Sequence, residues 1–178
     1  PTGVLKQYSS LEGRVREGKI GTVLNVTGAV TTRELQRIAV EETRLGIPLI
    51  FALDVIHGYK TISPVPLAES CSWDMETIEA SARMAAVEAS AAGLQWTFAP
   101  MVDIARDPRW GRVMEGAGED PYLGSCIARA RVRGFQGGDL SASNTILACA
   151  KHFAGYGASE GGRDYNTVDI SDQRLREL

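Results

Sequence analysis

Four short apolar segments alternate with helix-like segments along this chain, and that alternation limits what it can fold into. The apolar segments cover residues 21–26, 48–56, 96–104 and 145–153, and each is nearly continuously apolar over its first half. Such runs are typical of strands that are covered on both faces, as in a parallel sheet. The pattern therefore predicts an α/β fold with right-handed crossovers, and both an open doubly wound sheet and a (β/α)8 barrel satisfy it.

The segments between the predicted strands carry the signals of amphipathic helices. We expect helices over residues 33–45 and 75–92, a third that starts at Pro121, and a fourth that the last residues begin. Each is expected to start after a polar residue that can cap it. The predicted caps are Thr31 in a capping box with Glu34, then Asp74, Asp120 and Ser171.

Composition narrows the classes of function. The 178 residues indicate a single domain, and a hydrophobic share of 44% is enough for a buried core. Lys and Arg number 19 against 22 for Asp and Glu, so the chain lacks the basic surface of a nucleic-acid-binding protein. No apolar run reaches 18 residues, so no membrane partner is expected. The cysteines and histidines follow no metal-site spacing, and no glycine-rich phosphate motif is present, so neither a metal nor a cofactor is expected.

Charged side chains follow three of the predicted strands at the point where each ends. Asp54 lies near the end of the second apolar run and His57 follows it, Asp103 lies near the end of the third, and Lys151 and His152 end the fourth. Because the carboxyl ends of parallel strands meet at one edge of the sheet, these groups should converge on one site. Simpler interpretations remain open: Asp54 can cap a loop, His57 can be a core histidine, and Lys151 can extend past a sheet edge to water.

The long polar loop over residues 106–121 is the second candidate for function, since loops of this length in a compact fold usually carry one. Arg112 offers a fork of donors for neighbouring hydroxyl groups, and Trp110 offers an apolar platform of the kind on which sugar rings stack. Lys151 allows two chemistries: as a cation it donates to hydroxyl groups, and as a neutral amine it forms a Schiff base.

Three sequence blocks together resemble a known family. They are LDVIHG at Leu53–Gly58, FAPMVDIARDPRWGRVMEGAGEDPYLGS at Phe98–Ser125, and KHFAGYGASEGGRDYN at Lys151–Asn166. Their order and spacing resemble the N-terminal domain of glycoside hydrolase family 3, and most of all its bacterial periplasmic β-glucosidases. The resemblance covers residues 46–178.

The resemblance implies a TIM-like (β/α)8 barrel, of which residues 1–178 form about the first half, with no second domain in this chain. It also implies hydrolysis of terminal non-reducing β-D-glucosyl or xylosyl residues by a retaining mechanism, without a metal or cofactor. By motif position, the sugar is held by Asp54, Arg112, Lys151 and His152. Arg106 and Tyr156 are further candidates near the same site.

Two departures from the family pattern refine this expectation. The block KHFAGYG has Tyr156 where the family's N-acetylglucosaminidases have a histidine, which favours the glucosidase or xylosidase branch. The block that carries the nucleophilic aspartate in the family is absent, as is the second domain that supplies the acid/base. We therefore expect the nucleophile beyond Leu178, and a fragment that holds sugar but is itself inactive.

Two other functions stay open at this point. The chain can be a non-catalytic carbohydrate-binding half-barrel, or an aldolase that uses Lys151 as a Schiff base. An open parallel sheet exposes strand edges, so we expect self-association or pairing with the missing part of the barrel. The family resemblance implies a periplasmic or secreted protein, although the chain contains no signal peptide.

Overall fold

Three parallel strands organise the molecule. The computed structural model describes residues 11–178. Its strands are β1 (Thr22–Leu24), β2 (Ile50–Leu53) and β3 (Trp96–Thr97), hydrogen-bonded in the order β1-β2-β3. Thr22 pairs with Ile50, and Ala52 pairs with Trp96. The prediction of an α/β fold with a parallel sheet is confirmed.

The prediction of a regular fourth strand over residues 145–153 is wrong. Residues 145–153 run beside β3 and its continuation, but they form isolated parallel bridges, Leu147 with Trp96 and Lys151 with Met101. The Thr97 N–H donates to the Leu147 carbonyl at 2.9 Å. Pro100 lies between the two bridges and has no N–H to donate, so the ladder cannot continue evenly.

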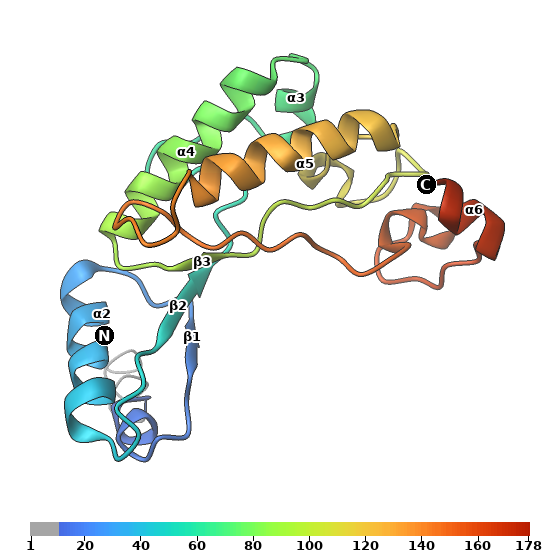
Figure 1. The fold of residues 1–178 in the computed structure, drawn as a ribbon. Coiled ribbons are helices and arrows are strands. Elements are labelled where there is room, and N and C mark those ends of the chain that lie inside the picture. Colours follow the sequence, from blue (N-terminus) through green and yellow to red (C-terminus); the bar gives the residue numbers. More distant parts are fainter. Residues whose placement is uncertain (1–10) are drawn as a thin grey trace.

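Helices precede, separate and follow the three strands, as Figure 1 shows. Residues 11–16 are helical, and three short 3-10 turns cover Val113–Glu115, Tyr156–Ala158 and Glu160–Gly162. The longer elements are α2 (Ala29–Arg37) with a π turn at Ile38–Glu42, α3 (Pro66–Ser70), α4 (Met75–Ala91), α5 (Pro121–Gln136) and α6 (Asp172–Glu177). Among residues 11–178, no helix combines the length and apolar character needed to cross a bilayer.

Three of the four predicted helix caps are confirmed. Asp74 accepts from the Thr77 N–H, Asp120 from the Leu123 N–H and Ser171 from the Arg174 N–H. The capping box of Thr31 with Glu34 is wrong, because α2 already starts at Ala29 and both residues lie inside it. Gly28 precedes the helix instead, and its N–H donates to the Ala92 carbonyl at 2.9 Å.

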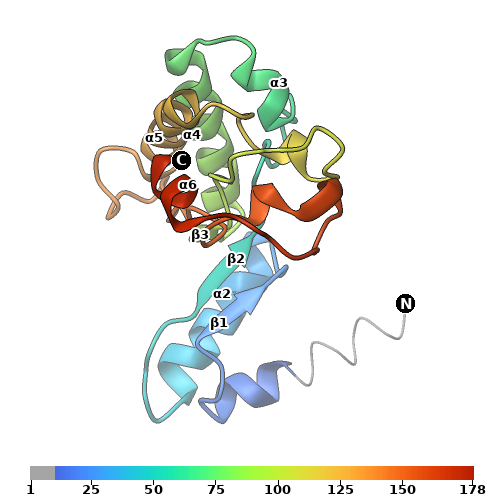
Figure 2. The same cartoon turned by 90° about the vertical axis from the view of Figure 1, so that its right-hand side faces the viewer.

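The main core joins the sheet to the helices. It contains Val23 and Phe51 from the strands, Leu35 from α2, Ala86 from α4 and Phe135 from α5. Helices α4 and α5 lie side by side in Figures 1 and 2. Their contact is close at Gly134, where a β-carbon would collide with the Glu79 carbonyl oxygen.

The sheet of the described residues is open. Figure 1 shows an arc in which α2 and β1 lie at one end and α6 at the other. The prediction that every strand is covered on both faces is wrong for β1, whose residues alternate between exposed and buried. Leu24 is 53% exposed and Ile50 is 38% exposed. These apolar side chains have no neighbouring strand or helix over them in the described part of the chain.

Candidate functional site

Lys151 and Asp54 meet at the carboxyl ends of two chain segments that flank β3 and its continuation. Lys151 Nζ donates to Asp54 Oδ1 at 2.7 Å. The Lys151 backbone is fixed beside the continuation of β3, since its carbonyl accepts from the Val102 N–H at 2.6 Å. The lysine side chain is 14% exposed and the aspartate side chain 57% exposed. Asp54 therefore presents an open carboxylate to solvent while the ammonium group behind it is largely covered.

His152 is held by Asp103. Asp103 Oδ2 lies 2.9 Å from His152 Nδ1 and also accepts from the His152 backbone N–H at 3.1 Å. The Asp103 side chain is only 1% exposed, so this carboxylate faces the histidine rather than water. Sequence reasoning placed Asp103 at a strand end without giving it a role.

Arg112 completes the polar part of the cluster. Its guanidinium donates to both carboxylate oxygens of Glu115, at 2.8 Å and 2.7 Å, and Nη1 lies 3.5 Å from His152 Nε2. Hydrogen bonding to Arg112 lowers the pKa of Glu115, and the same bonds raise the pKa of Arg112 still further above its usual range. Both groups are therefore charged, and Arg112 keeps its donor edge near His152.

Tyr156 and Trp110 form an aromatic wall beside the charged groups. The Tyr156 ring packs edge-on against His152, with ring centroids 4.8 Å apart, and the Arg112 guanidinium lies 5.7 Å from the Tyr156 centroid. Tyr156 Oη and Trp110 Nε1 both donate to Asp164 Oδ1, at 2.6 Å and 2.9 Å. Burial and the hydrogen bond to Asp164 raise the pKa of Tyr156 to about 12. The bond from Tyr156 lowers the pKa of Asp164 in turn.

The hypothesis that Trp110 is an open platform for a sugar ring is wrong. Trp110 is 1% exposed and packs in a small core with Met101 and Ala105. Its indole N–H is used by Asp164, from a loop 54 residues further along the chain. Trp110 therefore supports the wall from behind, and Tyr156 is the aromatic ring that faces His152.

The structure brings together five of the six predicted site residues: Asp54, Arg112, Lys151, His152 and Tyr156. Arg106 is exposed, and its side chain makes no hydrogen bond with the residues that the structure describes. Its backbone N–H donates to the Gly157 carbonyl at 3.0 Å, so it positions the Tyr156 loop through the main chain. Sequence reasoning missed Glu115 and the role of Asp164, although both lie in the loops that it singled out.

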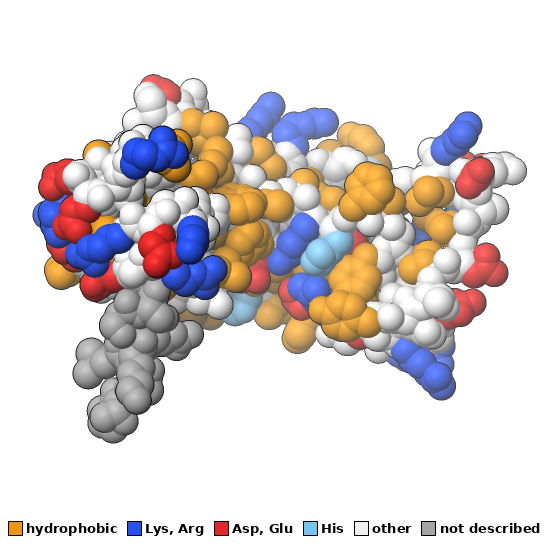
Figure 3. All heavy atoms as spheres, turned by 90° about the horizontal axis from the view of Figure 1, so that it is seen from below, with side chains coloured by type: hydrophobic (Ala, Val, Ile, Leu, Met, Phe, Trp, Pro, Cys, Tyr) orange, Lys and Arg blue, Asp and Glu red, His pale blue; other side chains and the backbone are white. Residues whose placement is uncertain are grey.

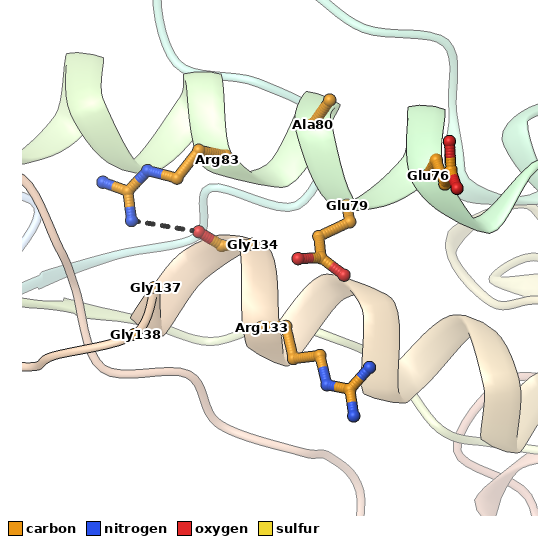
Figure 4. A pocket seen from close by; sticks show the side chains of 8 residues that line it. All are labelled: Glu76, Glu79, Ala80, Arg83, Arg133, Gly134, Gly137 and Gly138. Atoms are coloured by element: carbon orange, nitrogen blue, oxygen red, sulfur yellow. Dashed lines mark hydrogen bonds between the residues drawn. The ribbon is translucent and has the colours of Figure 1, made fainter.

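The face seen from below carries histidine, basic and hydrophobic side chains next to one another (Figure 3). A separate open groove of 590 Å3 is lined by residues of α4 and of the end of α5, with Gly137 and Gly138 after it (Figure 4). In it, Arg83 donates to the Gly134 carbonyl at 3.3 Å. None of the clustered residues lines this groove.

Within residues 11–178, no group of three Asp, Glu, His or Cys side chains is arranged to hold a metal ion.

Comparison with known proteins places the chain in a family. Residues 5–178 match the profile of the glycosyl hydrolase family 3 N-terminal domain. The chain belongs to this family. The resemblance drawn from the three sequence blocks is confirmed, and so is the fold, because the N-terminal domain of glycosyl hydrolase family 3 is a TIM-like barrel and this chain forms part of one.

Relatives in family 3 cover both glucosidases and xylosidases. The chain is 43% identical over 161 residues to the periplasmic β-glucosidase of Salmonella typhimurium, covering 90% of this chain and 21% of that protein. It is 36% identical over 157 residues to a β-xylosidase of Formosa agariphila, covering 82% of this chain and 22% of that protein. The structure of a mutant β-glucosidase from Listeria innocua in complex with laminaribiose superposes with a TM-score of 0.85 at 50% identity, covering 88% of this chain and 22% of that one. The chain thus spans between 21% and 22% of the length of these relatives.

Proposed function

We propose that Asp54, Arg112, Lys151 and His152 hold the terminal non-reducing β-D-glucosyl or xylosyl residue of a substrate that is cleaved by a retaining mechanism. The observation that carries the proposal is their convergence on one site from separate strand ends and one loop. Lys and Arg supply fixed donors, and the exposed Asp54 carboxylate supplies an acceptor. A sugar ring offers hydroxyl groups that both accept and donate, so this mixture suits a glycosyl residue.

Every carboxylate of the described cluster has a hydrogen-bonding partner, including the solvent-exposed Asp54. Retaining hydrolysis needs a nucleophile and an acid/base about 5–5.5 Å apart. The four carboxylates of the described site are already engaged: Asp54 with Lys151, Asp103 with His152, Glu115 with Arg112, and Asp164 with Tyr156 and Trp110. We therefore place the nucleophile in a segment beyond Leu178 and expect the 178-residue chain to bind sugar without cleaving it.

This geometry supports the two other functions less well. A Schiff-base aldolase needs a neutral lysine, whereas Lys151 is hydrogen-bonded to a carboxylate and acts as a cationic donor. A carbohydrate-binding half-barrel uses the same sugar contacts and differs from the leading proposal only in lacking a catalytic partner segment. Turnover in a longer polypeptide that contains these residues separates the two.

The same proposal also predicts what covers the exposed sheet and in which compartment the protein works. The exposed apolar face of the sheet at Leu24 and Ile50 should be covered by the rest of a barrel or by a second copy of the chain. Sedimentation velocity tests this directly, since a sharp monomer at all concentrations would contradict it. The periplasmic name of the Salmonella relative supports the same compartment for this protein.

Calorimetric titration of the chain with glucose, with hydrolysis of 4-nitrophenyl β-D-glucoside measured on the same sample, tests the proposal. We expect saturable binding and turnover no faster than the blank. Arg112→Met should weaken glucose binding by about 10- to 100-fold, because it removes charge-assisted hydrogen bonds. Arg109→Met is the matched control, since Arg109 is an exposed neighbour that pairs with Asp107 outside the cluster. Equal binding by both variants would exclude the proposed subsite.

A further inference from the structure

The hydrogen bonds of Asp103 define where the proton of His152 lies. Asp103 Oδ2 accepts from the His152 backbone N–H at 3.1 Å, and the same oxygen lies 2.9 Å from the Nδ1 atom of the ring. An oxygen that already accepts one hydrogen bond from an N–H faces the ring as an acceptor, so Nδ1 must be the donor. The contact is shielded, because the Asp103 side chain is 1% exposed.

The opposite side of the ring leads to the same assignment. His152 Nε2 lies 3.5 Å from Arg112 Nη1. A guanidinium group has donors and no acceptor, so a proton on Nε2 would point at another N–H. Tyr156 packs edge-on against the ring at 81°, which keeps the ring from turning. The contacts of both ring nitrogens therefore favour the same tautomer, in which Nδ1 carries the proton and Nε2 carries none.

We propose that Asp103 is a positioning residue that holds His152 in the Nδ1–H form, so that Nε2 accepts the hydrogen of a sugar hydroxyl group. Arg112 and Lys151 then donate to hydroxyl oxygens nearby, and the site takes a hydroxyl that donates and accepts at once. This inference rests on the sugar-binding function proposed above. It adds Asp103, to which the sequence motifs alone gave no role, and it states what His152 does: it accepts a hydrogen bond.

Nitrogen NMR of the imidazole rings tests the tautomer without any sugar. The chain has two histidines, so the His57→Gln variant assigns both sets of signals. We expect the His152 Nε2 signal far downfield, where bare imidazole nitrogens resonate, and Nδ1 at the position of an N–H. The Nε2–H tautomer or a mixture of both forms in the unsubstituted chain would overturn the inference, whether or not any variant folds.

Variants of Asp103 test its part in fixing the tautomer. Asp103→Ala should give an averaged mixture of tautomers, whereas Asp103→Asn should retain the Nδ1–H form, because its amide oxygen can replace Oδ2. Asp139→Asn is the matched control, in an exposed loop away from the cluster. Retention of the pure Nδ1–H form in a folded Asp103→Ala variant would show that Asp103 is not the residue that sets it.

Sugar analogues test the acceptor role of Nε2. Titrations compare glucose with its monodeoxy and monofluoro analogues, since fluorine accepts weakly and cannot donate. At one ring position we expect both replacements to cost about tenfold or more in affinity, and this loss should shrink in Asp103→Ala. If every fluoro analogue binds as glucose does, the acceptor role is wrong. Absence of glucose binding together with the expected tautomer would overturn the proposed function and the hydroxyl contact, and leave the Asp103–His152 arrangement standing.

Discussion

Lys151 Nζ and Asp54 Oδ1 lie 2.7 Å apart although 97 residues separate them in the chain. The pair is partly open, with the lysine side chain 14% exposed and the aspartate 57% exposed. Ion pairs that remain in contact with water add little to the stability of a fold. The pair instead fixes a donor and an acceptor side by side at a strand end, which is what recognition of a hydroxyl group requires.

Lys151→Met should therefore separate binding from stability. The substitution keeps the length of the side chain and removes the ammonium group, so we expect glucose affinity to fall by about 10- to 100-fold. The free energy of unfolding should change by less than about 1 kcal/mol. Calorimetry and urea unfolding measure the two quantities. Lys19→Met, at an exposed pair with Glu17, is the control and should change neither. A large loss of stability in Lys151→Met would assign the pair a structural role.

The buried pair of Arg131 and Glu69 should respond in the opposite way. Arg131 of α5 donates to the Glu69 carboxylate of α3 and, at 2.8 Å, to the Ile56 carbonyl in the loop after β2. Both side chains are less than a tenth exposed. Glu69→Leu alone leaves a buried guanidinium unpaired, so we expect a loss of about 3–5 kcal/mol in the free energy of unfolding.

The double variant Glu69→Leu with Arg131→Met is the decisive companion. It removes both charges, so most of the stability lost in Glu69→Leu should return. Urea unfolding of the unsubstituted chain, of Glu69→Leu and Arg131→Met alone, and of the double variant gives the coupling between the two sites. If the double variant is as unstable as Glu69→Leu alone, the damage arises from packing or from the lost bond to Ile56.

The gathering of Asp54, Lys151 and His152 could be predicted from sequence because it follows from the geometry of parallel strands. Each residue ends an apolar run, and the carboxyl ends of such runs meet at one edge. The caps at Asp74 and Asp120 could be predicted for a similar reason, since a cap depends on residues only three positions away. Local rules of this kind need no knowledge of the rest of the chain.

The roles of Trp110 and Asp103 could not be predicted, because distant residues decide them. Trp110 is buried by contacts that include Asp164, and Asp103 finds its partner in His152, 49 residues later. A polar loop with a tryptophan reads as an exposed platform until its packing is known. Residues 145–153 were predicted as a strand from their apolar character, but Pro100 in the neighbouring segment interrupts the pairing.

Gly134→Ala should destabilise the contact between α4 and α5. A β-carbon at residue 134 would collide with the Glu79 carbonyl oxygen and would lie 2.6 Å from Ala82 Cβ. Backbone atoms cannot move aside cheaply, so we expect a loss of about 1–3 kcal/mol despite the better helix propensity of alanine. Gly138→Ala is the matched control, because nothing lies within 4 Å of its added carbon. Equal midpoints of thermal unfolding for the two variants would contradict the close packing.

Tyr156 should make the fold sensitive to high pH. Burial, together with the hydrogen bond to Asp164, raises its pKa from 10.0 to about 12. Because the folded value lies above the unfolded one, the stabilisation is complete below pH 10 and is lost as the pH rises through about 12. In urea unfolding experiments across this range, the free energy of unfolding should fall as the pH rises. Tyr156→Phe has no proton to lose at this position, so its free energy of unfolding should fall less steeply. Tyr122→Phe is the control at an 80% exposed tyrosine of α5 and should follow the unsubstituted chain. If Tyr156→Phe keeps the full slope, another group is responsible for the loss of stability.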